Sequence, residues 1–272
     1  MQNSRQNRSL QRLKALVFFG LLPCIAHGEM ATVRDGVKLF YEIRGEGQPV
    51  VLLHGGTATI QLSFSKQIDM LAKSHKVIAI EQMGHGHSPD IEGRPFSYEV
   101  MTEDTAALLV KIGIKNADVV GWSDGGQIAL RLAAFHPELV RRVLVSGVGF
   151  GTAPASRQAI ETQTDARWPR EFRDNYVSTS PNGMAHWPVV WRKASMMWAR
   201  PTWGFTEADL HQIKAKTMIV AGSNDIVKAE VTHRVAKAIR GATVRILPDT
   251  DHWTFLRDDL MNPLLLEFLD GN

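Results

Sequence analysis

The segment Gly121-Trp122-Ser123-Asp124-Gly125 places a hydroxyl nucleophile between small residues. It follows the apolar run 117–120 and precedes a helical pattern over 127–134. In so tight a strand-to-helix turn, the central serine is strained and its hydroxyl stands above the end of a sheet, beside a helix N-terminus that can stabilise an oxyanion. The pentapeptide alone also fits a plain turn with a capping serine, so residues elsewhere must decide between the two interpretations.

A serine nucleophile needs a base, and the base needs a carboxylate that orients it. Asp225 follows the apolar run 217–221. His252 follows the apolar run 243–247. Because the carboxyl ends of parallel strands meet at one edge of a sheet, we expect Ser123, Asp225 and His252 to form a catalytic triad. Either partner alone would fit a turn aspartate or a surface histidine, so the prediction depends on the order serine, acid, histidine along the chain.

The sequence also offers donors for an oxyanion. His54-Gly55-Gly56 follows the apolar run 50–53, and glycines let a backbone N–H approach a substrate oxygen closely. We expect the N–H groups of Gly56 and Asp124 to form the oxyanion hole. The triplet alone would equally fit a simple turn, and His54 is interpreted as a structural hydrogen-bonding residue.

The elements that must position these residues are visible as alternating patterns. Apolar, strand-like runs cover 37–43, 49–53, 76–80, 119–120, 142–146, 217–221 and 243–247. Helical patterns fall between most of them, at 66–73, 98–112, 125–135, 230–239 and finally 263–269. Strands that alternate with helices predict an α/β fold with a doubly wound, mostly parallel sheet covered on both faces.

The alternation is interrupted once, between residues 147 and 216, where no buried-strand pattern occurs. This stretch is rich in tryptophan and methionine: Trp168, Trp187, Trp191, Trp198 and Trp203, with Met184, Met196 and Met197. We expect a helical lid over 149–210, inserted between the core segments 29–148 and 211–272.

Aromatic and methionine side chains suit an apolar, adaptable roof over a binding pocket. We therefore expect the substrate pocket to be lined by Trp122 and Trp253, which neighbour the nucleophile and the base, and by Trp187 and Trp191 of the lid. Part of the lid's aromatic content is expected to form the lid's own small core.

Residues 1–28 are interpreted as a secretory signal peptide. Four basic residues precede the apolar segment 15–26, which is too short to span a bilayer, and small residues follow it. Cleavage after Ala26 or Gly28 predicts a periplasmic or secreted protein without a stable membrane anchor. An uncleaved anchor, or a cytoplasmic protein that starts at Met30, are the alternatives.

Charge and cysteine content depend on that segment. It holds four basic and no acidic residues, so its removal would change the formal net charge from +3 to −1. The basic balance is thus no reason to expect nucleic acid as a partner. Cys24 is the one cysteine of the chain, which leaves the mature protein without thiol chemistry or disulfides.

We expect no cofactor and no metal, since no carboxylate stands at ligand spacing from His85 and His87.

Together these motifs resemble the α/β-hydrolase fold superfamily, in its serine esterase and lactonase-like branch. The matching segments run from about Val33 to the C-terminus: His54-Gly55-Gly56, Gly84-His85-Gly86-His87-Ser88, Gly121 to Gly126, Asp225 and His252. The resemblance implies the doubly wound fold and the triad. Many members carry an aspartate and an arginine ahead of the Gly-x-Gly-x-Ser loop, where this chain has Glu81-Gln82-Met83. Members that open epoxides or displace halide use an aspartate where this chain has Ser123.

The expected activity is hydrolysis of a carboxylic ester or lactone through an acyl-enzyme on Ser123. The resemblance extends to enzymes that open macrocyclic lactones, so a macrolide is among the candidate substrates. Three alternatives stay open. The same triad could serve perhydrolysis or C–C cleavage of a diketone. The protein could be a short-peptide serine peptidase, with Glu161 or Asp165 binding the substrate's amine. It could also be a hydrolase-like ligand receptor with slow turnover.

Overall fold

The computed structural model describes residues 28–271, and the predicted signal peptide lies outside these residues except for Gly28. Eight strands form one sheet in the order β1-β2-β4-β3-β5-β6-β7-β8. Strands β1, β2 and β4 pair antiparallel, and the other neighbours pair parallel. The strands are β1 Gly28–Thr32, β2 Lys38–Arg44, β3 Gln48–Leu53, β4 His75–Glu81, β5 Ala117–Trp122, β6 Val140–Ser146, β7 Lys216–Gly222 and β8 Thr243–Leu247. The predicted doubly wound, mostly parallel α/β fold is therefore confirmed.

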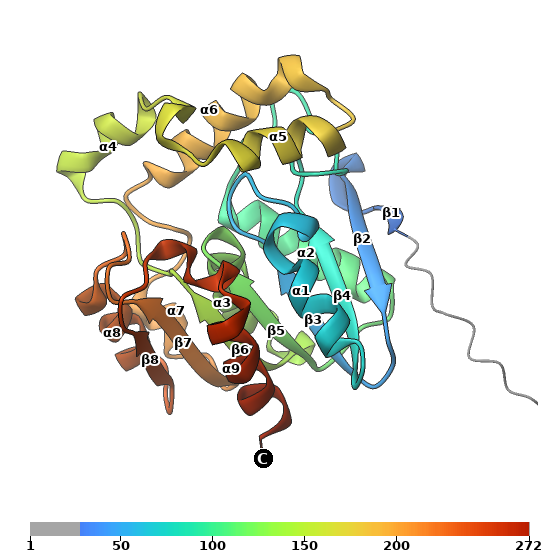
Figure 1. The fold of residues 1–272 in the computed structure, drawn as a ribbon, viewed down its shortest axis with the longest axis vertical. Helices are drawn as coiled ribbons and strands as arrows, with labels where there is room; N and C mark the ends of the chain where they lie inside the picture. Colours follow the sequence, from blue (N-terminus) through green and yellow to red (C-terminus); the bar gives the residue numbers. More distant parts are fainter. Residues whose placement is uncertain (1–27, 272) are drawn as a thin grey trace, which may run out of the picture.

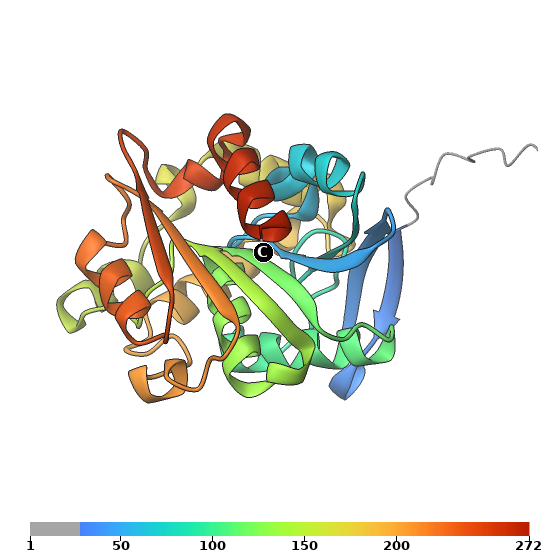
Figure 2. The ribbon, with the colours of Figure 1, turned by 90° about the horizontal axis from the view of Figure 1, so that it is seen from below.

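Helices cover both faces of the sheet, as Figure 2 shows from below. The central strand β3 explains why: Val51 and Leu53 pack into one hydrophobic core, while Val50 and Leu52 pack into the other. Because successive side chains of a strand point to opposite faces, a continuous apolar run needs a helical layer on each side. The helices are α1 Ile60–Leu71, α2 Tyr98–Lys111, α3 Asp124–Phe135, α4 Pro154–Glu161, α5 Arg170–Thr179, α6 Trp187–Trp198, α7 Glu207–Leu210, α8 Ala229–Lys237 and α9 Asp258–Asp270.

Two helices begin earlier than their apolar patterns predict. Helix α1 starts at Ile60 because the Thr59 side chain accepts a hydrogen bond from the backbone N–H of Leu62 and caps the helix. Helix α9 starts five residues before Pro263, with Asp258 and its acidic neighbour in the first turn. Acidic residues are favourable there because they oppose the helix dipole.

Helices α4, α5 and α6 belong to one insertion, residues 154–198, and Figure 1 shows them together at the end of the sheet toward which β4 points. Within residues 28–271, no strand occurs between β6 and β7. The insertion therefore covers the carboxyl edge of the parallel strands, where ligands bind in open α/β sheets. Over the same described residues, no helix has the length and apolar character that a bilayer crossing requires.

Candidate active site

Ser123 sits in a strained turn between β5 and α3. Its backbone has φ 53° and ψ −116°, a region that residues with a side chain rarely adopt. The neighbouring glycines make the turn possible. A Cβ atom on Gly121 would lie 2.3 Å from the carbonyl oxygen of Gly125, and a Cβ on Gly125 would lie 2.0 Å from that of Leu53. The Ser123 N–H donates to the Ser146 carbonyl at 2.7 Å, which ties the turn to β6.

A chain of hydrogen bonds joins the serine to a histidine and an aspartate. His252 Nε2 lies 2.9 Å from Ser123 Oγ, and His252 Nδ1 lies 2.8 Å from Asp225 Oδ1. With a carboxylate at Nδ1, that nitrogen carries the proton, and Nε2 is left to accept from the serine hydroxyl. Both partner side chains are buried, at 6% and 1% exposure. The structure thus brings together the three residues that the sequence analysis predicted from separate loops.

Trp122 helps to hold the histidine in place. Its indole Nε1 donates to the His252 backbone carbonyl at 2.9 Å, and the two rings lie 6.1 Å apart. On the other side, Gly147 leaves room for the imidazole, since a Cβ there would lie 2.6 Å from His252 Cε1. The imidazole is therefore packed between an indole and a glycine, which limits its rotation.

A cavity of about 430 Å³ opens beside the serine. Gly56 and Asp124, the predicted oxyanion donors, line it together with Ser123 and His252. Five tryptophans contribute to its walls: Trp122, Trp168, Trp198, Trp203 and Trp253. Its size lies within the range of small-molecule sites, and its walls favour an apolar ligand.

Two of the predicted pocket residues do not line this cavity, and here the prediction is corrected. The indole Nε1 of Trp187 donates to Asp165 Oδ2 at 2.7 Å, and that of Trp191 donates to the Gln163 carbonyl at 3.0 Å. Both are buried within the insertion. Trp198, at the C-terminal end of α6, lines the cavity instead.

The Asp124 side chain is a feature that the sequence analysis missed, because it assigned this residue only a backbone role. The carboxylate is buried in the cavity wall and accepts hydrogen bonds from Tyr98 Oη at 2.7 Å and from Trp198 Nε1 at 3.0 Å to each oxygen. Burial raises the pKa of Asp124 above its ordinary value, while the two hydrogen bonds lower it. Burial and the Asp124 charge also raise the pKa of Tyr98 well above its ordinary value.

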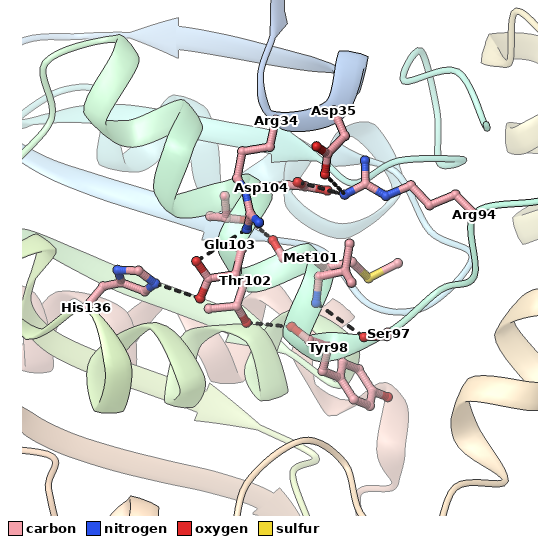
Figure 3. A network of polar contacts seen from close by, with 12 residues as sticks. Arg34, Asp35, Arg94, Ser97, Tyr98, Met101, Thr102, Glu103, Asp104 and His136 are labelled. Atoms are coloured by element: carbon pink, nitrogen blue, oxygen red, sulfur yellow. Dashed lines mark hydrogen bonds and ion pairs between the residues drawn. The ribbon is translucent and has the colours of Figure 1, made fainter.

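Helix α2 is anchored by a network of polar contacts that positions Tyr98 (Figure 3). Arg94 Nη2 lies 3.1 and 3.0 Å from the two carboxylate oxygens of Asp104, whose side chain is buried. Thr102 Oγ1 donates to the Tyr98 carbonyl at 2.7 Å. This network fixes the first turns of α2, from which the Tyr98 hydroxyl reaches Asp124.

Behind the cavity, Glu81 organises the loop after β4. Its carboxylate accepts from the backbone N–H of Ile60 at 3.2 Å and of His87 at 2.6 Å, and it lies 3.0 Å from His87 Nδ1. Glu81 stands where the resemblance noted from the sequence implies an aspartate. The glutamate joins the start of α1 to the loop that follows β4, so it has a structural role here.

His54 also has a structural role, as predicted from its place before the two glycines. Its Nε2 accepts from the backbone N–H of Gln82 at 3.0 Å, and its Nδ1 lies 2.8 Å from the Gly55 carbonyl. Burial lowers the pKa of His54 to about 3, helped by the neighbouring His85. A neutral ring with the proton on Nδ1 satisfies both contacts.

Comparison with known proteins places this chain in a family. A family model described as the alpha/beta hydrolase family matches residues 50–263. The 2-hydroxymuconate semialdehyde hydrolase of Pseudomonas sp. (strain CF600) is 25% identical over 244 residues, which cover 82% of this chain and 86% of the relative. The Homo sapiens serine hydrolase BPHL is 26% identical over 251 residues, which cover 86% and 84%. The enol-lactonase structure from Burkholderia xenovorans LB400 matches with a TM-score of 0.69 at 22% identity, over 89% of this chain and 100% of the enzyme. Because the family model spans most of the chain, the protein belongs to the alpha/beta hydrolase family.

Proposed function

We propose that this protein is a serine hydrolase that cleaves a carboxylic ester or lactone through an acyl-enzyme on Ser123. The observation that carries the proposal is the unbroken hydrogen-bond chain from Asp225 through His252 to Ser123, at 2.8 and 2.9 Å. A hydroxyl with a base at one side and a carboxylate behind the base is the arrangement that makes serine nucleophilic.

The reaction follows from this geometry. Ser123 Oγ attacks the carbonyl carbon while its proton passes to His252 Nε2, and Asp225 stabilises the imidazolium that forms. The negative charge on the former carbonyl oxygen is held by the N–H groups of Gly56 and Asp124. The intermediate expels the alkoxide, which takes the proton from His252 and leaves as an alcohol. Water then loses a proton to His252 and attacks the acyl carbon. The bond from that carbon to Ser123 Oγ breaks, the carboxylic acid leaves, and His252 returns the proton to Ser123 Oγ.

The cavity supports a hydrophobic substrate. Its indole walls and its volume of about 430 Å³ suit an apolar ester, a lactone or part of a macrocyclic lactone such as a macrolide. The relatives include an enol-lactonase and a 2-hydroxymuconate semialdehyde hydrolase. Similarity to the enol-lactonase favours lactone opening as the reaction. Similarity to the semialdehyde hydrolase leaves C–C cleavage of a diketone as an alternative reaction of the same triad.

The test is a substrate panel run with purified wild-type protein and Ser123→Ala. The panel holds aryl esters of graded chain length, simple lactones, macrolides and a diketone that can be cleaved at a C–C bond. Ser123→Ala should lose ester or lactone hydrolysis by roughly 10⁵-fold or more. Ser65→Ala, which removes an exposed serine of α1 away from the cavity, is the matched control and should retain activity. Full ester activity in Ser123→Ala would refute the proposal. Turnover of the diketone alone would support the C–C hydrolase. Ligand-induced stabilisation without turnover would support the receptor alternative.

A second candidate substrate carries a protonated amine, as in an amino-acid ester or a short peptide. Of the acids that the sequence analysis considered for an amine, neither Glu161 nor Asp165 lines the cavity, whereas the buried Asp124 carboxylate does. A charge-assisted hydrogen bond to an ammonium group would favour such substrates by roughly 10- to 100-fold.

The amine candidate is tested with two esters that differ only in the amino group, valine 4-nitrophenyl ester and 4-nitrophenyl 3-methylbutanoate. Wild-type protein should prefer the valine ester, and Asp124→Asn should lose that preference. Equal rates on the two esters in wild-type protein would reject the amine and leave the hydrophobic ester.

We also propose export of the protein, on the strength of residues 1–28 alone. Their basic start and apolar segment predict cleavage near Ala26 or Gly28. Expression of the full chain in a bacterial host, followed by fractionation and N-terminal sequencing, tests this. A mature N-terminus near residue 27 or 29 in the periplasm would support export, and an intact chain in the cytoplasm would contradict it.

A further inference from the structure

Trp198, the last residue of α6, touches both proposed oxyanion donors. Its indole Nε1 lies 3.0 Å from each carboxylate oxygen of Asp124. Its ring edge packs against Gly56 so closely that a Cβ there would lie 2.6 Å from Trp198 Cζ2. The same Cβ would lie 2.4 Å from Asp124 Oδ2. One indole of the insertion therefore contacts the glycine after β3 and the first residue of α3, which are far apart in sequence.

Both the backbone and the ring of Trp198 are held in place. The Trp198 backbone carbonyl accepts hydrogen bonds from Thr152 Oγ1 at 2.6 Å and from Trp203 Nε1 at 3.0 Å. Its ring stacks on Trp168 with centroids 5.3 Å apart and meets Trp191 edge-on at 5.7 Å. Ring contacts of this kind fix the orientation of an aromatic side chain. Trp198 therefore forms a rigid contact between the insertion and the serine turn.

The position of Asp124 explains why a rigid hydrogen-bond donor is needed here. A carboxylate beside an oxyanion hole would repel the oxyanion of the reaction unless donors compensate its charge. The Trp198 N–H and the Tyr98 hydroxyl supply two such donors. An oxyanion hole also depends on donors held within a few tenths of an ångström of their working position.

We propose that Trp198 is a positioning residue, which holds Gly56 and Asp124 in the arrangement that binds the oxyanion and compensates the Asp124 carboxylate. The proposal rests on the proposed function, because it concerns the same oxyanion. It assigns the insertion a role in transition-state stabilisation in addition to covering the substrate. The loss of Trp198 should therefore lower kcat more than it raises KM.

The test compares Trp198→Phe with Trp187→Phe. Both variants keep an aromatic ring in α6 and lose an indole N–H, but the Trp187 N–H binds Asp165 Oδ2 within the insertion. Hydrolysis of 4-nitrophenyl butyrate should fall roughly 10- to 100-fold in kcat for Trp198→Phe, with KM changed about twofold or less. Trp187→Phe should keep the wild-type kcat. Circular dichroism and Tm verify that both variants fold.

A second readout is the affinity for butylboronic acid, which forms a tetrahedral adduct with a serine nucleophile and places an oxygen in the oxyanion hole. Its Ki should rise in Trp198→Phe by about the same factor as kcat falls. Gly56→Ala would place a Cβ against Trp198 Cζ2 and Asp124 Oδ2, so it should show the same pattern and serves if Trp198→Phe does not fold.

A double-mutant cycle decides whether Trp198 acts through Asp124. Trp198→Phe should lower kcat by a smaller factor in an Asp124→Asn background than in the wild-type protein, because Asp124→Asn removes the charge that the Trp198 N–H compensates. Wild-type kcat and Ki in Trp198→Phe, or a loss confined to KM, would overturn the proposal. Esterase activity that survives Ser123→Ala would instead overturn the proposed function, so the two failures are distinguishable.

Discussion

Lys193 of α6 and Asp90 of the loop between β4 and α2 form a largely buried ion pair. The Lys193 Nζ lies 2.8 and 2.7 Å from the two carboxylate oxygens of Asp90, whose side chain has 0% exposure. It also donates to the Ile91 carbonyl at 2.9 Å, and His186 Nε2 lies 2.8 Å from Asp90 Oδ2. This pair and Trp198 at the serine turn are thus two of the contacts that join the insertion to the core.

The pair should contribute strongly to stability. Lys193→Met would leave the Asp90 carboxylate buried with its cation removed, and the free energy of unfolding should fall by about 3 kcal/mol. Urea denaturation measures the change. Lys66→Met is the matched control, because Lys66 pairs with Asp258 on the surface, where ion pairs contribute about 0–1 kcal/mol. Equal effects of the two substitutions would contradict a buried role for Lys193.

The orienting carboxylate should be essential for rate and dispensable for folding. Asp225→Asn keeps the shape of the side chain but cannot stabilise the His252 imidazolium or its working tautomer, so kcat should fall roughly 10⁴-fold. Steady-state kinetics on an aryl ester measure this, with Tm as the check on folding. Asp249→Asn, a substitution in the exposed turn before His252, should leave kcat unchanged. An active Asp225→Asn protein would remove Asp225 from the triad.

Stability should fall in acid because of the buried histidines. The pKa of His54 is lowered to about 3 in the folded protein, against 6.5 for the free group. Between these values the unfolded chain binds a proton that the folded chain does not, so the free energy of unfolding rises with pH through this window. The contribution of His54 to the free energy of unfolding is fully present above pH 6.5. It is lost as the pH falls below that value, by about 1.4 kcal/mol per pH unit for one proton. His85, whose pKa burial also lowers, adds in the same direction.

Urea titrations between pH 5 and pH 7.5 give this slope directly. His54→Asn should flatten it, and His211→Asn should not, because His211 is exposed. A slope of zero below pH 6.5 in the wild-type protein would contradict the neutral, buried state of His54.

The serine turn should tolerate no side chain at Gly125. A Cβ there would lie 2.0 Å from the Leu53 carbonyl oxygen, which is backbone and cannot move aside easily. Gly125→Ala should therefore lower the free energy of unfolding by about 3 kcal/mol and abolish activity. Gly93→Ala adds a Cβ in open space at a positive φ and should cost about 1 kcal/mol. Wild-type stability in Gly125→Ala would show that the turn is looser than its geometry indicates.

The sequence by itself indicated the residues for the chemistry and all strands of the sheet except the edge strand β1. A continuous apolar run such as 50–53 can only be satisfied with helices on both faces. Ser123 follows β5 directly, and Asp225 and His252 lie in the loops that follow β7 and β8, so all three lie at the edge where the parallel strands end. Local patterns sufficed because each residue is placed by the strand that precedes it.

The tertiary structure decided which side chains meet across elements. Trp187, Trp191 and Trp198 share one helix, and only the crossing of α6 over the sheet edge shows that Trp198 enters the cavity while the other two stay within the insertion. In the same way, the Asp124 carboxylate acquires its donors from α2 and α6. Such contacts join residues 26 and 74 positions apart, and they depend on the packing of helices whose relative placement no local pattern encodes.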